Sequence, residues 1–232
     1  MSNIAKAFEK GKAFIPFITC GDPSLEATEK IVYAMEEAGA DLIELGIPFS
    51  DPTAEGPVIQ EANIRALSGG VTTDKIFDMV VKIRKNTKIP MVFMTYANVV
   101  FSYGTERFVK KAAEIGMDGL ILPDVPFEEK EEFDCVCRKY GLDLISLIAP
   151  TSHDRIRMIA KEASGFVYCV SSSGNRNAER DHHRYRSYGE AGKESKRYSV
   201  RGRLWYLYSG SGCTDGRTFR RCHCGIGYRK AL

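Results

Sequence analysis

Apolar and polar residues follow two alternating patterns along the first three-quarters of the chain. Short, nearly continuous apolar runs are typical of strands buried on both faces of a parallel sheet. Amphipathic segments with helical spacing lie between these runs. The predicted strands are Phe14–Thr19, Leu42–Leu45, Pro90–Thr95, Gly119–Leu122, Leu144–Ile148 and Phe166–Val170. The predicted helices are Leu25–Ala38, Asp74–Lys85, Thr105–Ile115, Glu128–Tyr140 and Asp154–Glu162.

Capping residues support these helix boundaries. Polar residues suited to an N-cap stand at the predicted starts, namely Ser24, Thr73, Thr105 and Ser152. Glycines suited to the position after the last helical residue are Gly39, Gly116 and Gly141. Six strand–helix repeats predict an α/β fold with a parallel sheet. The pattern alone fits both a doubly wound sheet and a barrel.

The pattern stops at Gly174, and the composition changes there. Residues 1–174 carry 19 Lys and Arg against 25 Asp and Glu, a net charge of −6, whereas residues 175–232 carry 14 against 5, a net charge of +9. The second segment has only five Val, Ile or Leu among its 58 residues. We expect it to build no core and to be disordered. A basic segment with aromatic residues is also compatible with nucleic-acid binding, an alternative that we do not favour.

Composition excludes several other classes of protein. No apolar run approaches the roughly 18 to 20 residues of a membrane span, and Met1–Lys12 has no signal-peptide pattern, so we expect a cytoplasmic protein. The seven cysteines form no CxxC pair. Cys135–Cys137 and Cys222–Cys224 are CxC pairs, a weak metal signal because a closed zinc site needs four well-spaced ligands. We therefore expect no metal site.

Two carboxylates are the strongest candidates for chemistry. Glu44 ends an otherwise apolar predicted strand, and Glu55 lies in the following loop, which is rich in Pro, Gly, Ser and Asp. Active sites of parallel α/β folds form at the carboxyl ends of the strands. A strand-end carboxylate near a loop carboxylate suits acid/base catalysis, although an edge carboxylate facing solvent is the plain structural alternative.

The segment Glu44–Gln60, ELGIPFSDPTAEGPVIQ, resembles the signature of the tryptophan synthase alpha chain family. Further resemblances, in the same order, are Pro16–Pro23, Tyr96–Asn98, Leu122–Pro126 and Phe166–Gly174. The resemblance implies a (β/α)8 TIM barrel, of which residues 1–174 encode about six units. It also implies a lyase that cleaves indole-3-glycerol phosphate by a retro-aldol reaction in tryptophan biosynthesis. The alternative is an inactive remnant of that enzyme. Another phosphate-binding barrel would lack the Glu44–Gln60 motif.

The resemblance also implies roles for single residues. Glu44 matches the general acid/base, and Glu55 matches the residue that holds the indole N–H, where the family usually has Asp. The matches to the substrate pocket are Phe17, Tyr96 and Tyr168. The matches to the rim that meets the beta chain are Asp51, Asn98, Asp124 and Pro126. The expected assembly is an α2β2 tetramer, and the alpha reaction needs no bound cofactor.

The tail departs from the family, and a frameshift accounts for the departure. Codons exist for residues 174–188 that, read one base on, give VTGMRSEITTDIGV, which resembles the family's continuation. The same shift converts residues 197–208 to a segment containing DIPCAVGFGIS and residues 219–231 to SDGVIVGSAIVK. These resemble strands seven and eight with their phosphate loops, in the correct order. We therefore interpret residues 175–232 as a one-base frameshift product. This predicts a polypeptide that is insoluble or largely inactive, because the barrel is left open and the phosphate loops are missing.

Overall fold

One parallel sheet organises the chain. The structure, a computed structural model, describes residues 2–9, 13–148, 153–170, 206–208 and 222–223. Its strands are β1 (Phe17–Thr19), β2 (Ile43–Gly46), β3 (Met91–Met94), β4 (Gly119–Ile121), β5 (Asp143–Ile148), β6 (Val167–Cys169), β7 (Tyr206–Tyr208) and β8 (Cys222–His223). Their order in the sheet equals their order in the chain, from β1 at one end to β8 at the other. This order excludes the doubly wound alternative, in which the strand order reverses.

The first six strands confirm the six predicted ones, with boundaries that differ by a few residues. The hydrophobic pattern did not indicate β7 and β8. Their backbones pair in parallel, β7 with β6 and β8 with β7. Both lie within the segments that the shifted reading assigns to strands seven and eight. The predicted disorder of the tail otherwise concerns residues outside the described ranges.

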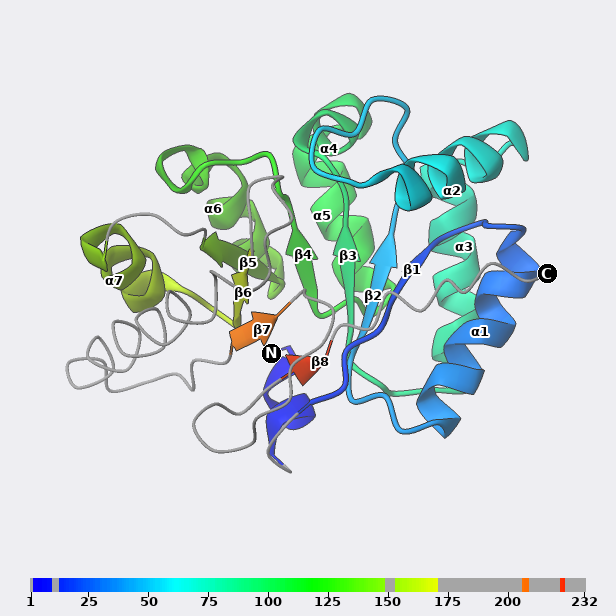
Figure 1. The fold of residues 1–232 in the computed structure, drawn as a ribbon, viewed down its shortest axis with the longest axis horizontal. Coiled ribbons are helices and arrows are strands. Elements are labelled where there is room, and N and C mark those ends of the chain that lie inside the picture. Colours follow the sequence, from blue (N-terminus) through cyan, green and yellow to red (C-terminus); the bar gives the residue numbers. More distant parts are fainter. Residues whose placement is uncertain (1, 10–12, 149–152, 171–205, 209–221, 224–232) are drawn as a thin grey trace.

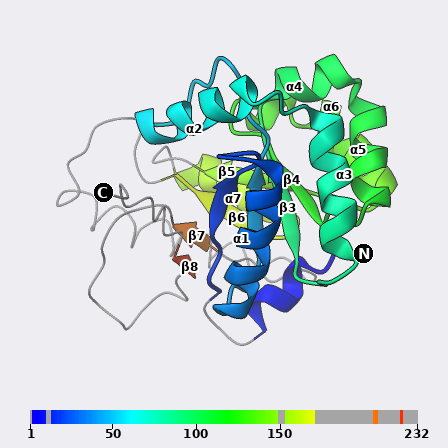
Figure 2. The ribbon, with the colours of Figure 1, turned by 90° about the vertical axis from the view of Figure 1, so that its right-hand side faces the viewer.

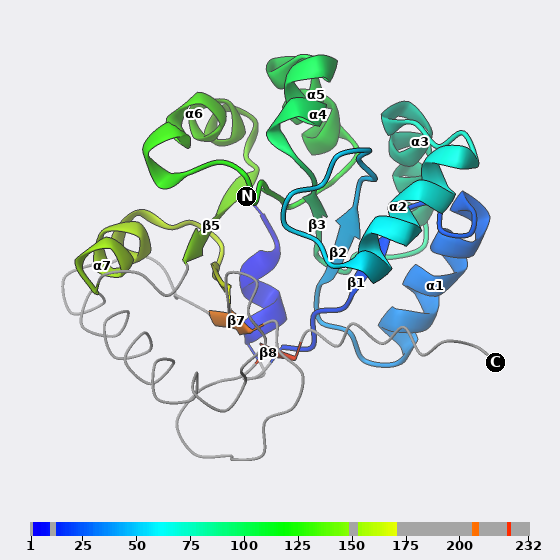
Figure 3. The same cartoon turned by 45° about the horizontal axis from the view of Figure 1, so that its top comes forward.

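The helices cover the outer side of the curled sheet, as Figure 1 and Figure 3 show. They are α1 (Leu25–Glu37), α2 (Pro57–Ser68), α3 (Thr73–Arg84), α4 (Ala97–Tyr103), α5 (Thr105–Glu114), α6 (Glu131–Tyr140) and α7 (His153–Glu162), with 3-10 turns η1 (Ile4–Phe8) and η2 (Phe127–Glu129). Figure 2 shows α2 and α4 together at the carboxyl ends of the strands. Within the described part of the chain, no helix combines the length and the apolar character that a membrane crossing requires.

The predicted helix starts are correct in part. The Ser24 hydroxyl caps α1 by accepting from the Ala27 N–H at 3.2 Å. The predicted cap at Thr73 is wrong by one residue, because Thr72 accepts from the Lys75 N–H and Thr73 is already helical. The predicted cap at Thr105 is wrong because Gly104, with φ +91°, takes that position. Ser152 lies outside the described residues.

The three predicted helix ends are confirmed. Gly39, Gly116 and Gly141 all have positive φ values, between +78° and +91°, which glycine adopts without the steric penalty of a Cβ. The pattern missed α2, which has 12 residues, and the seven-residue α4; both follow loops rich in polar or aromatic residues.

The strands have two buried faces, each with its own core. The outer face packs under the helices through residues such as Ile43, Leu45 and Phe93. The inner face forms a second cluster that includes Leu42, Val92, Ile121, Ile145 and Tyr168. Because successive side chains of a strand alternate in direction, Glu44 and Gly46 share the inner face with Leu42.

The turn η1 closes the amino end of the inner core. Ile4 and Phe8 are fully buried there, and the Phe8 ring lies 5.9 Å from the Phe166 ring. The opposite end, where the strands finish, carries the loops that hold the candidate site residues.

Candidate active site

Glu44 is a buried carboxyl group that has no hydrogen-bond partner among the described residues. It lies in β2 between Phe17 of β1 and Val92 of β3 in the strand register. Its exposed fraction is 0%, and neither carboxyl oxygen has a hydrogen-bond partner in the described structure. Burial raises the pKa of Glu44 from 4.5 to about 8. Desolvation disfavours the charged form, so the group is mostly protonated at neutral pH.

Two neighbours of Glu44 that sequence reasoning did not single out also belong to this site. Thr19, at the end of β1, has a fully buried hydroxyl with no hydrogen-bond partner in the described structure. It stands opposite Gly46 in the register. A Cβ on Gly46 would lie 2.6 Å from Cζ of Phe17, so only glycine leaves room for that ring. Thr19 lies in the motif Pro16–Pro23 and Gly46 in the motif Glu44–Gln60. Membership in these motifs is the sequence signal that could have identified them.

Glu55 lies in the loop between β2 and α2 and is held by its neighbours. The Tyr96 hydroxyl donates a hydrogen bond to Oε2 of Glu55. The side-chain amide of Gln60 donates to the backbone carbonyl of Glu55 at 2.9 Å. Burial raises the pKa of Glu55, the hydrogen bond from Tyr96 opposes that rise, and the negative charge of Asp124 adds to it.

The three predicted aromatic residues are on the inner side or the carboxyl end of the sheet. Phe17 stands beside Glu44 in the register, and Tyr168 of β6 belongs to the inner core, with an exposed fraction of 8%. Tyr96 follows β3, is also buried, and packs its ring 5.2 Å from the ring of Phe49. The structure therefore brings Phe17 to Glu44 and Tyr96 to Glu55.

Three of the four predicted rim residues lie in loops at the same end, and Asn98 lies in the first turn of α4. Asp124 accepts from the backbone N–H of Ala97 with both oxygens, at 3.0 and 3.1 Å. Asp51 accepts from the hydroxyl of Ser50, and Asn98 from that of Ser102 at 3.5 Å. Pro126 precedes η2.

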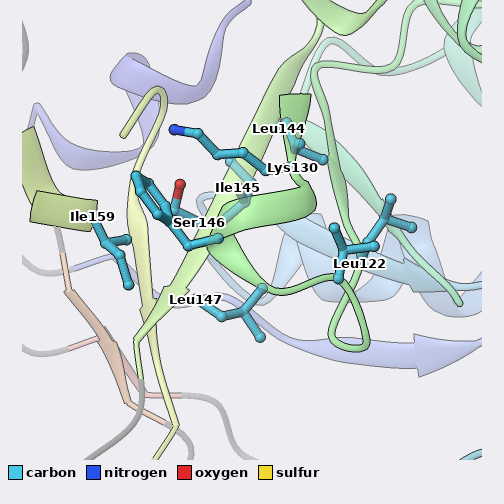
Figure 4. Close-up of a pocket in the computed structure, with 9 residues that line it drawn as sticks. Leu122, Lys130, Leu144, Ile145, Ser146, Leu147 and Ile159 are labelled. Atoms are coloured by element: carbon cyan, nitrogen blue, oxygen red, sulfur yellow. The ribbon is translucent and has the colours of Figure 1, made fainter. Parts of the chain in front are cut away.

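Two cavities of the described structure lie elsewhere. Figure 4 shows one of about 30 Å³, room for about one water, between β5, α7 and the segment from Leu122 to Lys130 that includes η2. A depression of about 390 Å³ lies between α1, α3 and the Gly69–Gly70 turn. None of the predicted site residues lines either of them.

The described residues offer few alternatives for reactive groups. They contain no group of three or more His, Cys, Asp or Glu placed to hold a metal ion. Cys135 is exposed, whereas Cys137 is buried and its pKa is raised to about 12, mainly by burial. Buried thiols of this kind are poor nucleophiles because the thiolate is the reactive form.

A protonated carboxyl group among aromatic rings can donate and recover a proton near neutral pH. The half-buried carboxylate of Glu55 can accept a hydrogen bond from a ligand. This combination suits proton-transfer chemistry on an aromatic molecule.

Comparison with known proteins matches this arrangement to one family. The family model described as tryptophan synthase alpha chain matches residues 4–186, which runs past the predicted break at Gly174. The tryptophan synthase alpha chain of Alkaliphilus metalliredigens is 55% identical over 163 residues, which cover 70% of this chain and 61% of that protein. The chain thus spans about three-fifths of that relative's length.

Solved structures show the same likeness in three dimensions. The crystal structure of tryptophan synthase subunit alpha from Legionella pneumophila has a TM-score of 0.75 and 36% identity, covering 90% of this chain and 79% of that one. A structure of the tryptophan synthase α2β2 complex from Pyrococcus furiosus contains a chain with a TM-score of 0.72 and 35% identity, covering 84% and 79%. The chain therefore belongs to the tryptophan synthase alpha chain family.

Proposed function

We propose that this chain carries the site of a lyase that cleaves indole-3-glycerol phosphate to indole and glyceraldehyde 3-phosphate, the alpha reaction of tryptophan biosynthesis. The observation that carries the proposal is Glu44. It is fully buried within β2, without a hydrogen-bond partner in the described structure, and its pKa is raised to about 8. Leaving a buried carboxyl group unpaired costs stability, which a catalytic role accounts for.

In the proposed reaction, Glu44 acts twice. Its protonated carboxyl first donates a proton to carbon 3 of the indole ring, which places positive charge on the ring system. The resulting carboxylate then takes the proton of the glyceryl hydroxyl as the carbon–carbon bond breaks. Indole and the aldehyde leave, and Glu44 is protonated again, so no external acid or base is consumed.

Glu55 has a different role in this proposal. Its carboxylate accepts a hydrogen bond from the indole N–H and stabilises the positive charge that develops when carbon 3 is protonated. Phe17, Tyr96 and Tyr168 form the apolar surroundings that hold the ring and favour the protonated form of Glu44.

We also propose that the chain assembles with a tryptophan synthase beta chain in the cytoplasm. The proposed contact residues lie at the carboxyl end of the sheet, where such a partner would receive indole. Asp51, Asp124 and Pro126 are in loops, and Asn98 is in the first turn of α4. The similarity to a chain of the Pyrococcus furiosus α2β2 complex supports this partner. The alpha reaction itself calls on no cofactor, because the side chains supply every proton transfer.

We also propose a two-part organisation of the chain. Residues 1–174 form a partial barrel, and residues 175–232 are the product of a one-base frameshift. The order of three shifted segments and the positions of β7 and β8 within two of them support it. Resequencing the gene across the codons of Ser173 and Gly174 tests it. An additional or missing base there is expected, and an intact frame that continues as printed would overturn the proposal.

An assay of indole release tests the proposed function. The chain as printed is compared with a frame-restored chain, in which the shifted reading replaces residues 175–232, each with and without beta chain. We expect the frame-restored chain to release indole and the printed chain to release far less, because the shifted segments carry the phosphate loops. A frame-restored chain that folds but releases no indole would contradict the lyase and favour the inactive remnant.

A further inference from the structure

Tyr96 clamps the loop that carries Glu55. Its hydroxyl donates to Oε2 of Glu55 and accepts from the backbone N–H of Ala54 at 2.9 Å. Its ring lies 5.2 Å from the ring of Phe49, earlier in the same loop. Three contacts from one buried side chain therefore fix both the course of the loop and one carboxyl oxygen of Glu55.

Tyr96 is itself held from the other side. It directly precedes α4, and the next residue, Ala97, donates its backbone N–H to both carboxyl oxygens of Asp124. A carboxylate on the first N–H of a helix fixes the helix start and the residue before it. Asp124 thus braces the backbone from which the Tyr96 side chain extends.

The clamp determines how Glu55 can meet a ligand. A carboxylate accepts through two oxygens, and Tyr96 engages Oε2. A carboxylate has about four acceptor positions, so beside the bond from Tyr96 and one from its own backbone N–H, Glu55 keeps the capacity to accept a donor from the site. An aromatic ring with one N–H matches such a single, oriented acceptor.

We propose that Tyr96, braced by Asp124, is a positioning residue that orients the Glu55 carboxylate for one heteroaromatic N–H and thereby gives the site its preference for indole. The identity of the ligand rests on the proposed function, whereas the clamp itself does not.

Binding of indole and benzofuran to the full chain tests the preference. The two molecules have nearly the same shape, but benzofuran has an oxygen in place of the N–H. Calorimetry should give a dissociation constant at least fivefold lower for indole. In Tyr96→Phe this preference should fall to about twofold or less. Tyr103→Phe is the matched control, because Tyr103 lies on α4 and donates to Asp74 at 2.6 Å, away from Glu55.

NMR titration of Glu55 in the free chain supplies a readout that needs no ligand. Because the hydrogen bond from Tyr96 lowers the pKa of Glu55, Tyr96→Phe should raise that pKa and Tyr103→Phe should not. An unchanged Glu55 pKa in Tyr96→Phe overturns the clamp. A moved pKa with an unchanged indole preference overturns the assigned specificity. Equal binding of indole and benzofuran by the unsubstituted chain overturns that specificity and the proposed indole site, while the titration still decides the clamp.

Discussion

The two ends of the sheet each bury a carboxyl group, and they treat it in opposite ways. Asp118, at the amino end, accepts hydrogen bonds from the backbone and side chain of Asn3, from Arg84 and from the backbone N–H of Met91. Glu44, towards the carboxyl end, accepts none in the described structure. Both are almost completely buried. Buried polar groups normally have hydrogen-bond partners. We therefore interpret Asp118 as a structural residue, and Glu44, which accepts no hydrogen bond in the described structure, as a residue that serves chemistry.

At the amino end, Asp118 ties three segments together. The bonds from Asn3 hold the start of η1, and the bond from Arg84 holds the end of α3. Arg84 also donates to the carbonyl of Gly116 at 3.0 Å. Asp118 and the carbonyl of Gly116 thus both receive hydrogen bonds. Because these acceptors are paired, closing the inner core at this end costs little desolvation energy.

At the carboxyl end, the unpaired Glu44 reduces stability in a pH-dependent way. The unfolded chain loses this proton above about pH 4.5, whereas the folded chain keeps it until about pH 8. A raised acid pKa therefore lowers the free energy of unfolding by about 1.4 kcal/mol per pH unit across that interval, with no further loss above it.

The largest expected effect tests the catalytic side of the comparison. Glu44→Gln keeps the shape of the side chain but removes the proton transfer, so indole release by the frame-restored chain should fall at least about 100-fold. The same substitution should leave the fold intact and stabilise it at neutral pH. Glu37→Gln, an exposed site on α1, is the control and should change neither property. A Glu44→Gln variant that still releases indole would show that the carboxyl group of Glu44 has no catalytic role.

A second substitution tests the structural side. Asp118→Ala removes the shared acceptor and leaves Arg84 and two backbone N–H groups without it, so we expect a loss of about 3 kcal/mol in the free energy of unfolding. Urea denaturation measures it. Asp154→Ala, whose side chain is 94% exposed, should cost less than about 0.5 kcal/mol. Equal effects at the two positions would contradict the assigned role of the amino end.

The smallest effect concerns the packing beside Glu44. In Gly46→Ala the new Cβ would lie 2.6 Å from Cζ and 2.8 Å from Cε2 of Phe17, so the ring must move. We expect a stability loss of about 1 kcal/mol and weaker indole binding by calorimetry. Gly56→Ala, where a Cβ meets nothing within 4 Å, should cost less stability. Undiminished indole binding in Gly46→Ala would show that Phe17 does not line the pocket.

Sequence patterns predicted the parts of the fold that depend on local apolar periodicity. The first six strands and the helix ends at Gly39, Gly116 and Gly141 are of this kind. The helices α2 and α4 were missed; the start of α4 depends on a tertiary contact, the bond from Ala97 to Asp124. The caps at Thr72 and Gly104 were missed because neighbouring candidates differ only in backbone conformation.

The sequence predicted the residues of the candidate site better than the contacts between them. Glu44 and Glu55 stand out by position and motif. The bond from Tyr96 to Glu55 joins residues 41 positions apart, and no local pattern encodes it. Thr19 was missed because a hydroxyl in a buried strand is unremarkable until its lack of a hydrogen-bond partner is seen.

Glu44, buried and without a hydrogen-bond partner in the described structure, is expected to stay protonated at neutral pH. Titration of the chain with ¹³C-labelled glutamate, followed by NMR and assigned with Glu44→Gln, measures its pKa directly. We expect a value of about 8. A value near the ordinary 4.5 would contradict it, since Glu44 would then be ionised and paired or solvated in the folded chain.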